Sequence, residues 1–305
     1  MRSLFLATSQ SKWLQEHATR HSFMRRAVSR FMPGETVAEA LDAASALRKE
    51  SIGVVLTCLG ENVTTPSEAE TVMAHYLDAL ALMRERNLTA ELSVKLTHLG
   101  LDFDPELCYR NLARIAGAAS EGTLWIDMEA TPYVDATLEM YRRSRAAQLR
   151  AGVCLQAYLY RTAADLESLL PLSPAIRLVK GAYNEPPDRA FPRKRDVDEN
   201  FFTLATRLLS VDARAAHVRA AIATHDRQLI QKLTQYAGAQ NIPKDCFEFQ
   251  MLYGIQRTEQ LRLAREGWRT AVLISYGSYW FPWYMRRLAE RPANAWFVVR
   301  SLLSA

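Results

Sequence analysis

The chain has 305 residues, of which 49% are hydrophobic and 23% are charged. This composition excludes a disordered protein, and the length fits either one β/α barrel of about 250 residues with an extension or two domains of about 150 residues. The formal net charge is +5, with positive and negative residues interspersed. Nucleic-acid binders concentrate basic residues in a stripe. No nucleic-acid partner is therefore expected, and the densest basic cluster, residues 193–195, is interpreted as a solvated loop.

The sequence shows neither a targeting segment nor a membrane span. The apolar run at residues 4–7 is too short for a signal peptide, and no stretch reaches the roughly 18 apolar residues of a spanning helix. The four cysteines form no CxxC pair, which favours buried free thiols in a reducing compartment. We expect a cytoplasmic protein, or one that attaches loosely at the inner membrane surface.

Residues 1–48 are predicted to be a helical extension. Apolar and polar residues interleave at helical spacing up to about residue 31, Pro33-Gly34 interrupts the pattern, and residues 35–49 resume it. We place a domain boundary here, with a catalytic barrel over residues 49–305.

From residue 52 onward, short runs rich in Val, Ile and Leu alternate with helical segments. Eight such runs occur, at residues 52–57, 92–96, 124–129, 153–159, 176–180, 221–225, 247–252 and 271–275. Strand-helix alternation predicts a parallel sheet with right-handed crossovers. Eight units predict an α/β fold of the (β/α)8 TIM-like barrel type. An open doubly wound sheet usually has fewer units and a GxGxxG turn, and the sequence contains none.

The predicted strands carry polar residues that an ordinary barrel core would not hold. Active sites of β/α barrels lie at the carboxyl ends of the strands, and a buried charge is costly unless it is paired. We therefore expect these side chains to converge there, with two cations beside the carboxylates. Glu248 could instead be a structural charge and His225 a core histidine. The residues concerned are Lys95, Asp127, Glu129, Gln156, Arg177, Lys180, Thr224, His225, Asp226, Glu248 and Gln250.

A second candidate is the adjacent pair Arg286-Arg287 in a predicted helix. Arginine captures carboxylates through two parallel hydrogen bonds. On spacing alone, a solvated basic helix turn explains the pair equally well.

Metal and serine-nucleophile chemistry have no sequence support. The six histidines form no HxH, HxxxH-plus-ligand or HExxH pattern, and no GxSxG motif occurs. We expect no metal site.

At these residues the sequence resembles the proline dehydrogenase family. The resemblance runs from about residue 34 to residue 294, and the pieces that carry it follow one another in order, each at a predicted strand end or in the loop after it. They are SVKLTHLGLD (93–102), IDMEA (126–130), LQAYLYR (155–161), RLVKGAY (177–183), FPRKRDVDEN (191–200), ATHD (223–226), EFQMLYGI (248–255) and YMRRLAERPAN (284–294).

The resemblance implies FAD held without a covalent bond in a distorted barrel, and transfer of a hydride from proline to flavin N5 to give Δ1-pyrroline-5-carboxylate. Electrons would then pass to a quinone, with transient contact at a membrane. Arg286 and Arg287 would clamp the carboxylate of a small cyclic amino acid and Glu290 would hold them. Lys95, supported by Asp127, would close the other side of the pocket.

The resemblance also implies the flavin contacts. Arg177 would lie beside flavin N5, and Tyr183 would contact the substrate. FAD would contact Met128, Gln156, Lys180, Gly181, Ala182, Thr224 and His225.

One departure from the family pattern bears on the substrate. The family usually reads RVYIPYG in the eighth strand, and the tyrosine of that motif aligns with Leu273; a second usual tyrosine aligns with Trp283. Leucine removes a hydroxyl and frees volume. We therefore expect retained oxidation with altered ring specificity.

Two alternatives stay open at this stage. A lysine inside a barrel strand can form a Schiff base, and either Lys95 or Lys180 could do so in a lyase. The chain could also be a non-catalytic relative that still binds FAD.

Overall fold

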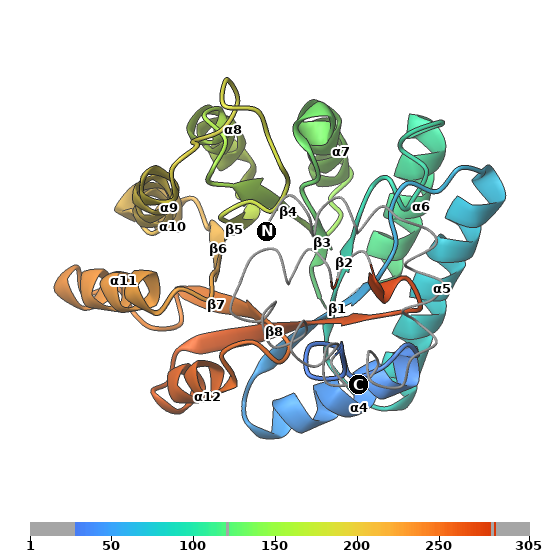
Figure 1. Ribbon diagram of the computed structural model, residues 1–305, viewed down its shortest axis with the longest axis horizontal. Helices are drawn as coiled ribbons and strands as arrows, with labels where there is room; N and C mark the ends of the chain where they lie inside the picture. The colour runs from blue at the N-terminus through green and yellow to red at the C-terminus, as the bar shows by residue number, and fades with distance from the viewer. Residues whose placement is uncertain (1–27, 120–121, 282–283, 285–305) are drawn as a thin grey trace, which may run out of the picture.

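The computed structural model describes residues 28–119, 122–281 and 284. Its centre is a closed barrel of eight parallel strands in sequential order, with β8 paired to β1 (Figure 1). The predicted barrel is confirmed, and every predicted run overlaps an observed strand. The strands are β1 (Gly53–Cys58), β2 (Glu91–Val94), β3 (Leu124–Ile126), β4 (Ala151–Gln156), β5 (Ala175–Val179), β6 (Arg219–Ala223), β7 (Phe247–Leu252) and β8 (Arg269–Tyr276).

Helices surround the barrel in a ring (Figure 1). Their starts follow local capping chemistry: Thr65 and Glu68 form a reciprocal capping box at α5, and the Asp226 side chain accepts a hydrogen bond at the start of α11. The α-helices are α4 (Val37–Lys49), α5 (Pro66–Glu85), α6 (Pro105–Ala118), α7 (Val134–Ala146), α8 (Thr162–Leu169), α9 (Lys194–Leu208), α10 (Val211–Ala215), α11 (Arg227–Ala239) and α12 (Arg257–Arg265), with 3-10 turns η1 (Thr131–Tyr133) and η2 (Leu170–Leu172).

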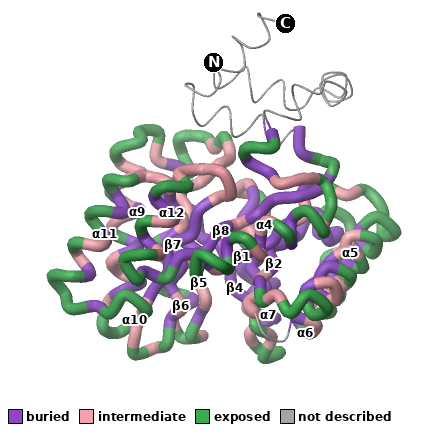
Figure 2. The backbone as a smooth tube through the Cα atoms, turned by 90° about the horizontal axis from the view of Figure 1, so that it is seen from below, coloured by how far each residue is buried: buried purple, intermediate pink, exposed green. Residues whose placement is uncertain are grey.

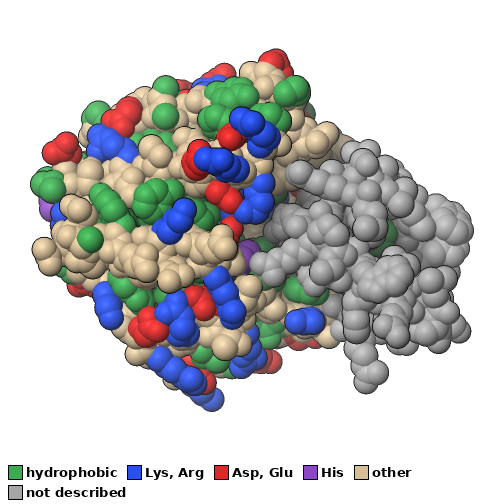
Figure 3. Space-filling view, turned by 60° about the vertical axis from the view of Figure 1, so that its left-hand side comes forward, with side chains coloured by type: hydrophobic (Ala, Val, Ile, Leu, Met, Phe, Trp, Pro, Cys, Tyr) green, Lys and Arg blue, Asp and Glu red, His purple; other side chains and the backbone are tan. Residues whose placement is uncertain are grey.

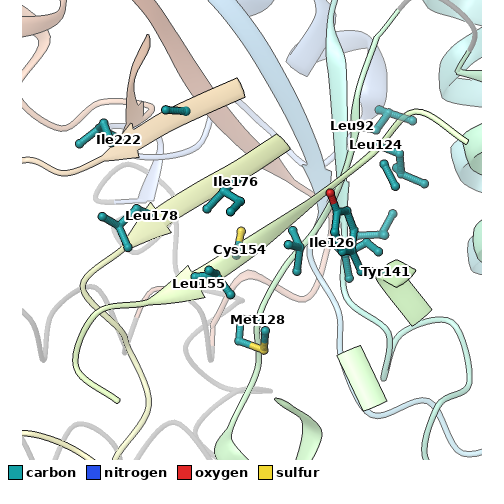
Figure 4. Close-up of a cluster of buried hydrophobic side chains, with 14 of the residues drawn as sticks. Leu92, Leu124, Ile126, Met128, Tyr141, Cys154, Leu155, Ile176, Leu178 and Ile222 are labelled. Carbon is teal, nitrogen blue, oxygen red and sulfur yellow. The ribbon is translucent and has the colours of Figure 1, made fainter. Parts of the chain in front are cut away.

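The main core lies between the strands and the ring of helices. Outward-facing strand side chains such as Leu124, Ile126 and Ile176 have no exposed surface, and Tyr141 of α7 packs in the same layer (Figure 4). Strands buried on both faces have continuous apolar runs, which is why the runs were visible in the sequence. Figure 2 shows the buried backbone at the centre of the molecule and exposed backbone on the outer helices.

The barrel interior is filled by its own side chains. Val55, Trp125, Ala221 and Leu273 pack together inside it. A Cβ atom at Gly152 would lie 2.6 Å from the Trp125 ring, so the glycine leaves room for the indole. The guanidinium carbons of Arg177 and Arg219 lie 4.7 Å and 5.1 Å from centroids of the Trp125 ring system. The interior is therefore built as stacked layers rather than as an open channel.

The amino end of the barrel is closed by an ion network around Arg219. Its Nη1 lies 2.5 Å from Glu91 Oε1 and its Nη2 lies 2.8 Å from Glu248 Oε1, while Trp125 Nε1 donates to Glu91 Oε2 at 2.8 Å. Glu248 is the second residue of β7 and thus lies at the amino end of its strand. The expectation that Glu248 joins the other charges at the carboxyl ends is wrong for this reason, and its structural role is the correct one.

Several predicted element ends differ from the observed ones. Lys95 and Lys180 were predicted to lie within their strands. In the structure β2 ends at Val94 and β5 at Val179, so each lysine is the first residue after its strand. β3 also ends at Ile126, before Asp127 and Glu129. Polar side chains after a strand leave the ladder and begin the βα loop.

The basic cluster at residues 193–195 is not a loop. Arg193 is the residue before α9, and Lys194 and Arg195 form its first turn. These side chains are solvated, as predicted, with 76–85% exposure, and they pair with nearby carboxylates. Figure 3 shows the mixture of basic and acidic side chains on one face of the molecule.

The N-terminal extension is described only in part, since residues 1–27 lie outside the described residues. Helix α4 buries Ala40, Leu41, Ala44 and Leu47 against β1 and β8. Thr36 caps it in a box with Glu39, so the helix begins at Val37 rather than at residue 35. The boundary between residues 48 and 49 stays a prediction. Within the described residues, no helix is long and apolar enough to cross a membrane.

The Arg219 network predicts a pH-dependent stability defect in Arg219→Met. Removal of the guanidinium leaves Glu91 without its cation and Glu248 with the more distant Arg269 at 3.6 Å, and we expect a loss of roughly 3 kcal/mol in urea unfolding at about pH 8. In the native protein burial raises the pKa of Glu91, but Arg219 outweighs it and keeps that pKa lowered. Without Arg219, only the hydrogen bonds from Trp125 and Thr123 still oppose burial, so we expect the pKa of Glu91 to rise and the folded variant to bind protons more readily than its unfolded chain. Its stability relative to the native protein should therefore recover as the pH falls to about 5.

The control for this experiment is Arg195→Met, which removes an exposed arginine that pairs with Glu199. Its unfolding midpoint should match that of the native protein. An Arg219→Met variant as stable as the native protein at the higher pH, or one that loses further stability on acidification, would contradict the account.

Candidate active site

The centre of the candidate site is the carboxylate of Asp127. Asp127 follows β3, and its backbone N–H still donates to Val94 O at 2.8 Å, which fixes the residue at the strand end. Its Oδ1 accepts hydrogen bonds from Ser93 Oγ at 2.7 Å and from Arg177 Nη1 at 3.1 Å. Lys95 Nζ lies 3.7 Å from Oδ2. The predicted pairing of two cations with a carboxylate at the strand ends is confirmed for these residues.

Arg177 lies in the middle of β5 and is 3% exposed. Its Nη1 donates to Asp127 Oδ1 and to Ser93 Oγ, both at 3.1 Å. Its Nε and Nη2 atoms are buried and have no hydrogen-bond partner among the described residues. A guanidinium has five N–H donors, and buried donors without acceptors are costly. This edge of Arg177 is therefore suited to an acceptor atom of a bound molecule.

Gln156 at the end of β4 has a second unsatisfied group. Its Nε2 donates to Met128 O at 3.3 Å, which orients the amide. Its Oε1 is buried and has no partner in the described part of the chain. Met128 itself is buried just beyond β3 (Figure 4). The amide thus presents an acceptor from the same end of the barrel as Arg177.

Lys180, directly after β5, is held by two carboxylates. Its Nζ lies 2.5 Å from Asp198 Oδ1 and 2.9 Å from Asp226 Oδ2. Lys194 contacts the same two carboxylates, which closes a ring of four charges. Burial raises the pKa of Asp226, but the hydrogen bonds and charges of the two lysines outweigh it and lower that pKa to about 2. The ring ties the end of β5 to α9 and to the start of α11.

Gly181 has a backbone φ of +117°, which favours glycine. A Cβ atom at this position would lie 2.3 Å from the Tyr158 ring. The close neighbour at Gly181 is therefore the Tyr158 side chain. The next two residues, Ala182 and Tyr183, are half-buried.

The β6 end supplies Thr224 and His225. The Thr224 hydroxyl accepts a hydrogen bond from Asp226 N at 3.1 Å. His225 Nε2 lies 3.5 Å from Leu252 N of the neighbouring strand. These contacts fix the turn that leads into α11, at the same end of the barrel as Gln156 and Lys180.

Leu273 lies on β8, opposite Val55 of β1 and Leu252 of β7. It is half-buried and packs on the interior cluster that contains Trp125. Its side chain thus faces the barrel interior, as the predicted substrate position requires. Arg286, Arg287, Glu290 and Trp283 lie outside the described residues.

Ser93 is a residue of the candidate site that the sequence analysis missed. It is fully buried and contacts both Asp127 and Arg177. The sequence did contain a signal for Ser93. Side chains of a strand alternate between its two faces, so Glu91, Ser93 and Lys95 point to the same, inward face of β2. Asp198, the partner of Lys180 on α9, had no comparable signal. Glu129 bonds to the Thr97 backbone and hydroxyl instead of joining Asp127, and burial raises its pKa.

Metal binding has no geometric support in the described ranges, where no three His, Cys, Asp or Glu side chains gather as a metal site requires. The polar groups that gather at this end of the barrel are instead one carboxylate, two cations and one amide. Such a set suits an organic ligand with both acceptor and donor atoms.

Comparison with known proteins shows to which family the chain is similar. The family model for proline dehydrogenase matches residues 40–300. Proline dehydrogenase 1 of Bacillus subtilis (strain 168) is 39% identical over 306 aligned residues, which cover 99% of each chain. The proline dehydrogenase of Deinococcus radiodurans is 38% identical over 281 residues, covering 90% of this chain and 89% of that one.

The fold comparison agrees. The structure of proline utilization A from Bdellovibrio bacteriovorus, inactivated by N-propargylglycine, superposes with a TM-score of 0.80 at 24% identity. The match covers 87% of this chain and 32% of that one, so this chain spans about a third of that longer protein. At this identity the likeness shows the barrel fold alone. The family model and the full-length relatives show more: the chain belongs to the proline dehydrogenase family.

Proposed function

We propose that this protein oxidises proline, or a closely related cyclic secondary amino acid, with FAD as its hydride acceptor. Membership of the family and full-length similarity to named proline dehydrogenases support an oxidoreductase acting on proline. The observation that carries the proposal is the ion pair between buried Arg177 and partly buried Asp127, in which two nitrogen atoms of Arg177 lack acceptors among the described residues.

The residues present fit a flavin. The unpartnered edge of Arg177 would donate to acceptor nitrogens of an isoalloxazine, and Gln156 Oε1 would accept from its N–H. Met128, Lys180, Gly181, Ala182, Thr224 and His225 lie at or just beyond the carboxyl ends of β3, β5 and β6, where they would hold the rest of the cofactor. When bound, FAD supplies the two-electron acceptor that no side chain provides.

The protein's own contribution is charge and orientation. The positive charges of Lys95, Arg177 and the Arg286-Arg287 pair would crowd the site and lower the pKa of the substrate amine by like-charge repulsion, which favours the neutral amine that can release hydride. Arg286 and Arg287, supported by Glu290, would hold the carboxylate in a fixed orientation, and Tyr183 would contact the ring. Asp127 keeps Lys95 and Arg177 in place.

A Schiff-base lyase is the weaker alternative. A nucleophilic lysine must lose its proton, whereas a carboxylate partner stabilises the ammonium. Lys180 lies between two carboxylates and Lys95 faces Asp127. Neither is set up as a nucleophile, which supports the oxidation instead. A non-catalytic flavin binder remains the other reading, and turnover decides between them.

Leu273 would set the ring specificity. It faces the interior beside Val55 and Trp125, where the family's usual tyrosine would carry a hydroxyl and greater volume. We propose that the freed space admits a substituted or larger ring.

We also propose a quinone as the final electron acceptor, reached by peripheral contact with the cytoplasmic membrane surface.

The cofactor proposal predicts a yellow protein that releases FAD on acid denaturation. Gln156→Met should weaken FAD binding by about tenfold, since one hydrogen bond to the ring would be lost. The measurement is the FAD dissociation constant of the flavin-free protein. Gln231→Met, at an exposed position on α11, is the control and should bind as the native protein does. A colourless protein that takes up no FAD would contradict the proposal.

The specificity proposal predicts that kcat/KM for 4-hydroxyproline, 4-methylproline or pipecolate comes within about tenfold of the value for proline. Leu273→Tyr should shift the ratio toward proline, because the larger side chain refills the space beside the ring. Steady-state kinetics on the four compounds measures both. If proline exceeds every other compound by more than about tenfold, or if Leu273→Tyr leaves the ratios unchanged, the specificity proposal is wrong.

A further inference from the structure

Ser93 is placed between the two charged groups at the centre of the site. It lies on β2 and is fully buried, and its Oγ is 2.7 Å from Asp127 Oδ1 and 3.1 Å from Arg177 Nη1. A hydroxyl has one donor and two acceptor lone pairs. Here the serine O–H donates to the carboxylate of Asp127, and the serine oxygen accepts from the guanidinium of Arg177. The negative group therefore accepts and the positive group donates, as their charges favour.

The Ser93 backbone is fixed independently of its side chain. The last β1–β2 register pair is Leu56 with Leu92, so the ladder ends one residue before Ser93. Beyond that point Tyr76 of α5 takes over: its hydroxyl donates to Ser93 O at 3.0 Å and accepts from Cys58 N at 3.1 Å. The Ser93 backbone is therefore held by its pairing with Trp125 of β3 and by a buried bridge from a helix, independently of the contact between its hydroxyl and Asp127.

The alternatives to Ser93 for orienting Arg177 are few among the described residues. The salt bridge to Asp127 uses only Nη1, and the Trp125 ring supports the guanidinium from one side without fixing its rotation. Cys154 Sγ is 3.6 Å from the same Asp127 oxygen and is a weak donor. The serine hydroxyl is the group that contacts carboxylate and guanidinium together, and it thereby determines where the unpartnered Nε and Nη2 edge points.

We propose that Ser93 is a positioning residue for the oxidation, acting through the Asp127–Arg177 pair and touching neither substrate nor cofactor. This rests on the function proposed above. Loss of the hydroxyl leaves the charges present but frees Arg177 to rotate about its long side chain. We expect the reaction to be sensitive to that rotation, because the direction of the Nε and Nη2 edge of Arg177 decides which atom of a bound molecule it can contact.

The kinetic test is Ser93→Ala combined with Asp127→Ala, which removes the acceptor oxygens, in a double-mutant cycle. In the native background, Ser93→Ala should lower kcat by about 10- to 100-fold, the range expected for loss of a hydrogen bond to a charged group. KM should stay within about twofold, because the serine does not contact the substrate. In the Asp127→Ala background, the same change should lower kcat by less than about twofold, since the pair through which it acts is already broken.

The matched control is Ser144→Ala. Ser144 is also fully buried, and its hydroxyl bonds only to Met140 O within α7. Its kcat should equal the native value. Thermal unfolding of all variants shows whether a loss of kcat reflects loss of fold. An equal effect of Ser93→Ala in both backgrounds, or an unchanged kcat in the native background, would overturn the proposal.

A spectroscopic measurement tests the positioning without any turnover. The Arg177 side-chain Nε–H signal in a nitrogen-15 spectrum is assigned by its loss in Arg177→Lys. We expect it to shift and broaden in Ser93→Ala and to be unchanged in Ser144→Ala. Superimposable Arg177 signals in native and Ser93→Ala protein would refute the proposal. This result is separate from the proposed function, which would fail instead if the native protein oxidised no cyclic amino acid.

Discussion

The carboxylate of Asp127 is the interaction on which the candidate site depends. It stands just beyond β3 and holds two cations from other strands: the guanidinium of Arg177, from the middle of β5, and the ammonium of Lys95, just beyond β2. Two cations confined to the mouth of a barrel repel one another, and burial raises the cost. A single carboxylate between them makes the arrangement tolerable, and it leaves one edge of Arg177 available to a ligand.

The same barrel interior separates the functional end from the stabilising end. Arg177 and Arg219 both lie against the indole of Trp125, but Arg177 pairs at the carboxyl end and Arg219 at the amino end. Arg219 has acceptors from Glu91 and Glu248 and completes a closed network. Both arginines have a buried Nε without a hydrogen-bond partner among the described residues, but the terminal nitrogens of Arg219 both have acceptors, whereas Nη2 of Arg177 has none. The unpartnered terminal nitrogen of Arg177 is what suits it to a ligand.

Much of the fold could be predicted from the sequence, because strands buried on both faces must be apolar along their length. That constraint made all eight strands visible. The convergence of Lys95, Asp127 and Arg177 followed from the rule that the ends of parallel strands meet. Glu248 was misplaced because a charge within an apolar run does not reveal which end of the strand it occupies. Ser93 was missed because a small hydroxyl in such a run resembles an ordinary core residue. Asp198 reaches Lys180 from a helix, and that contact arises only in three dimensions.

The most direct measurement of the central claim is the absorbance of the purified protein under anaerobic conditions before and after addition of L-proline. The account predicts a flavin spectrum that bleaches on mixing, and bleaching that is slowed when Asp127 is replaced by alanine, because Arg177 and Lys95 then lose their shared partner. A protein with no bound flavin, or a flavin that no cyclic amino acid reduces, would contradict it.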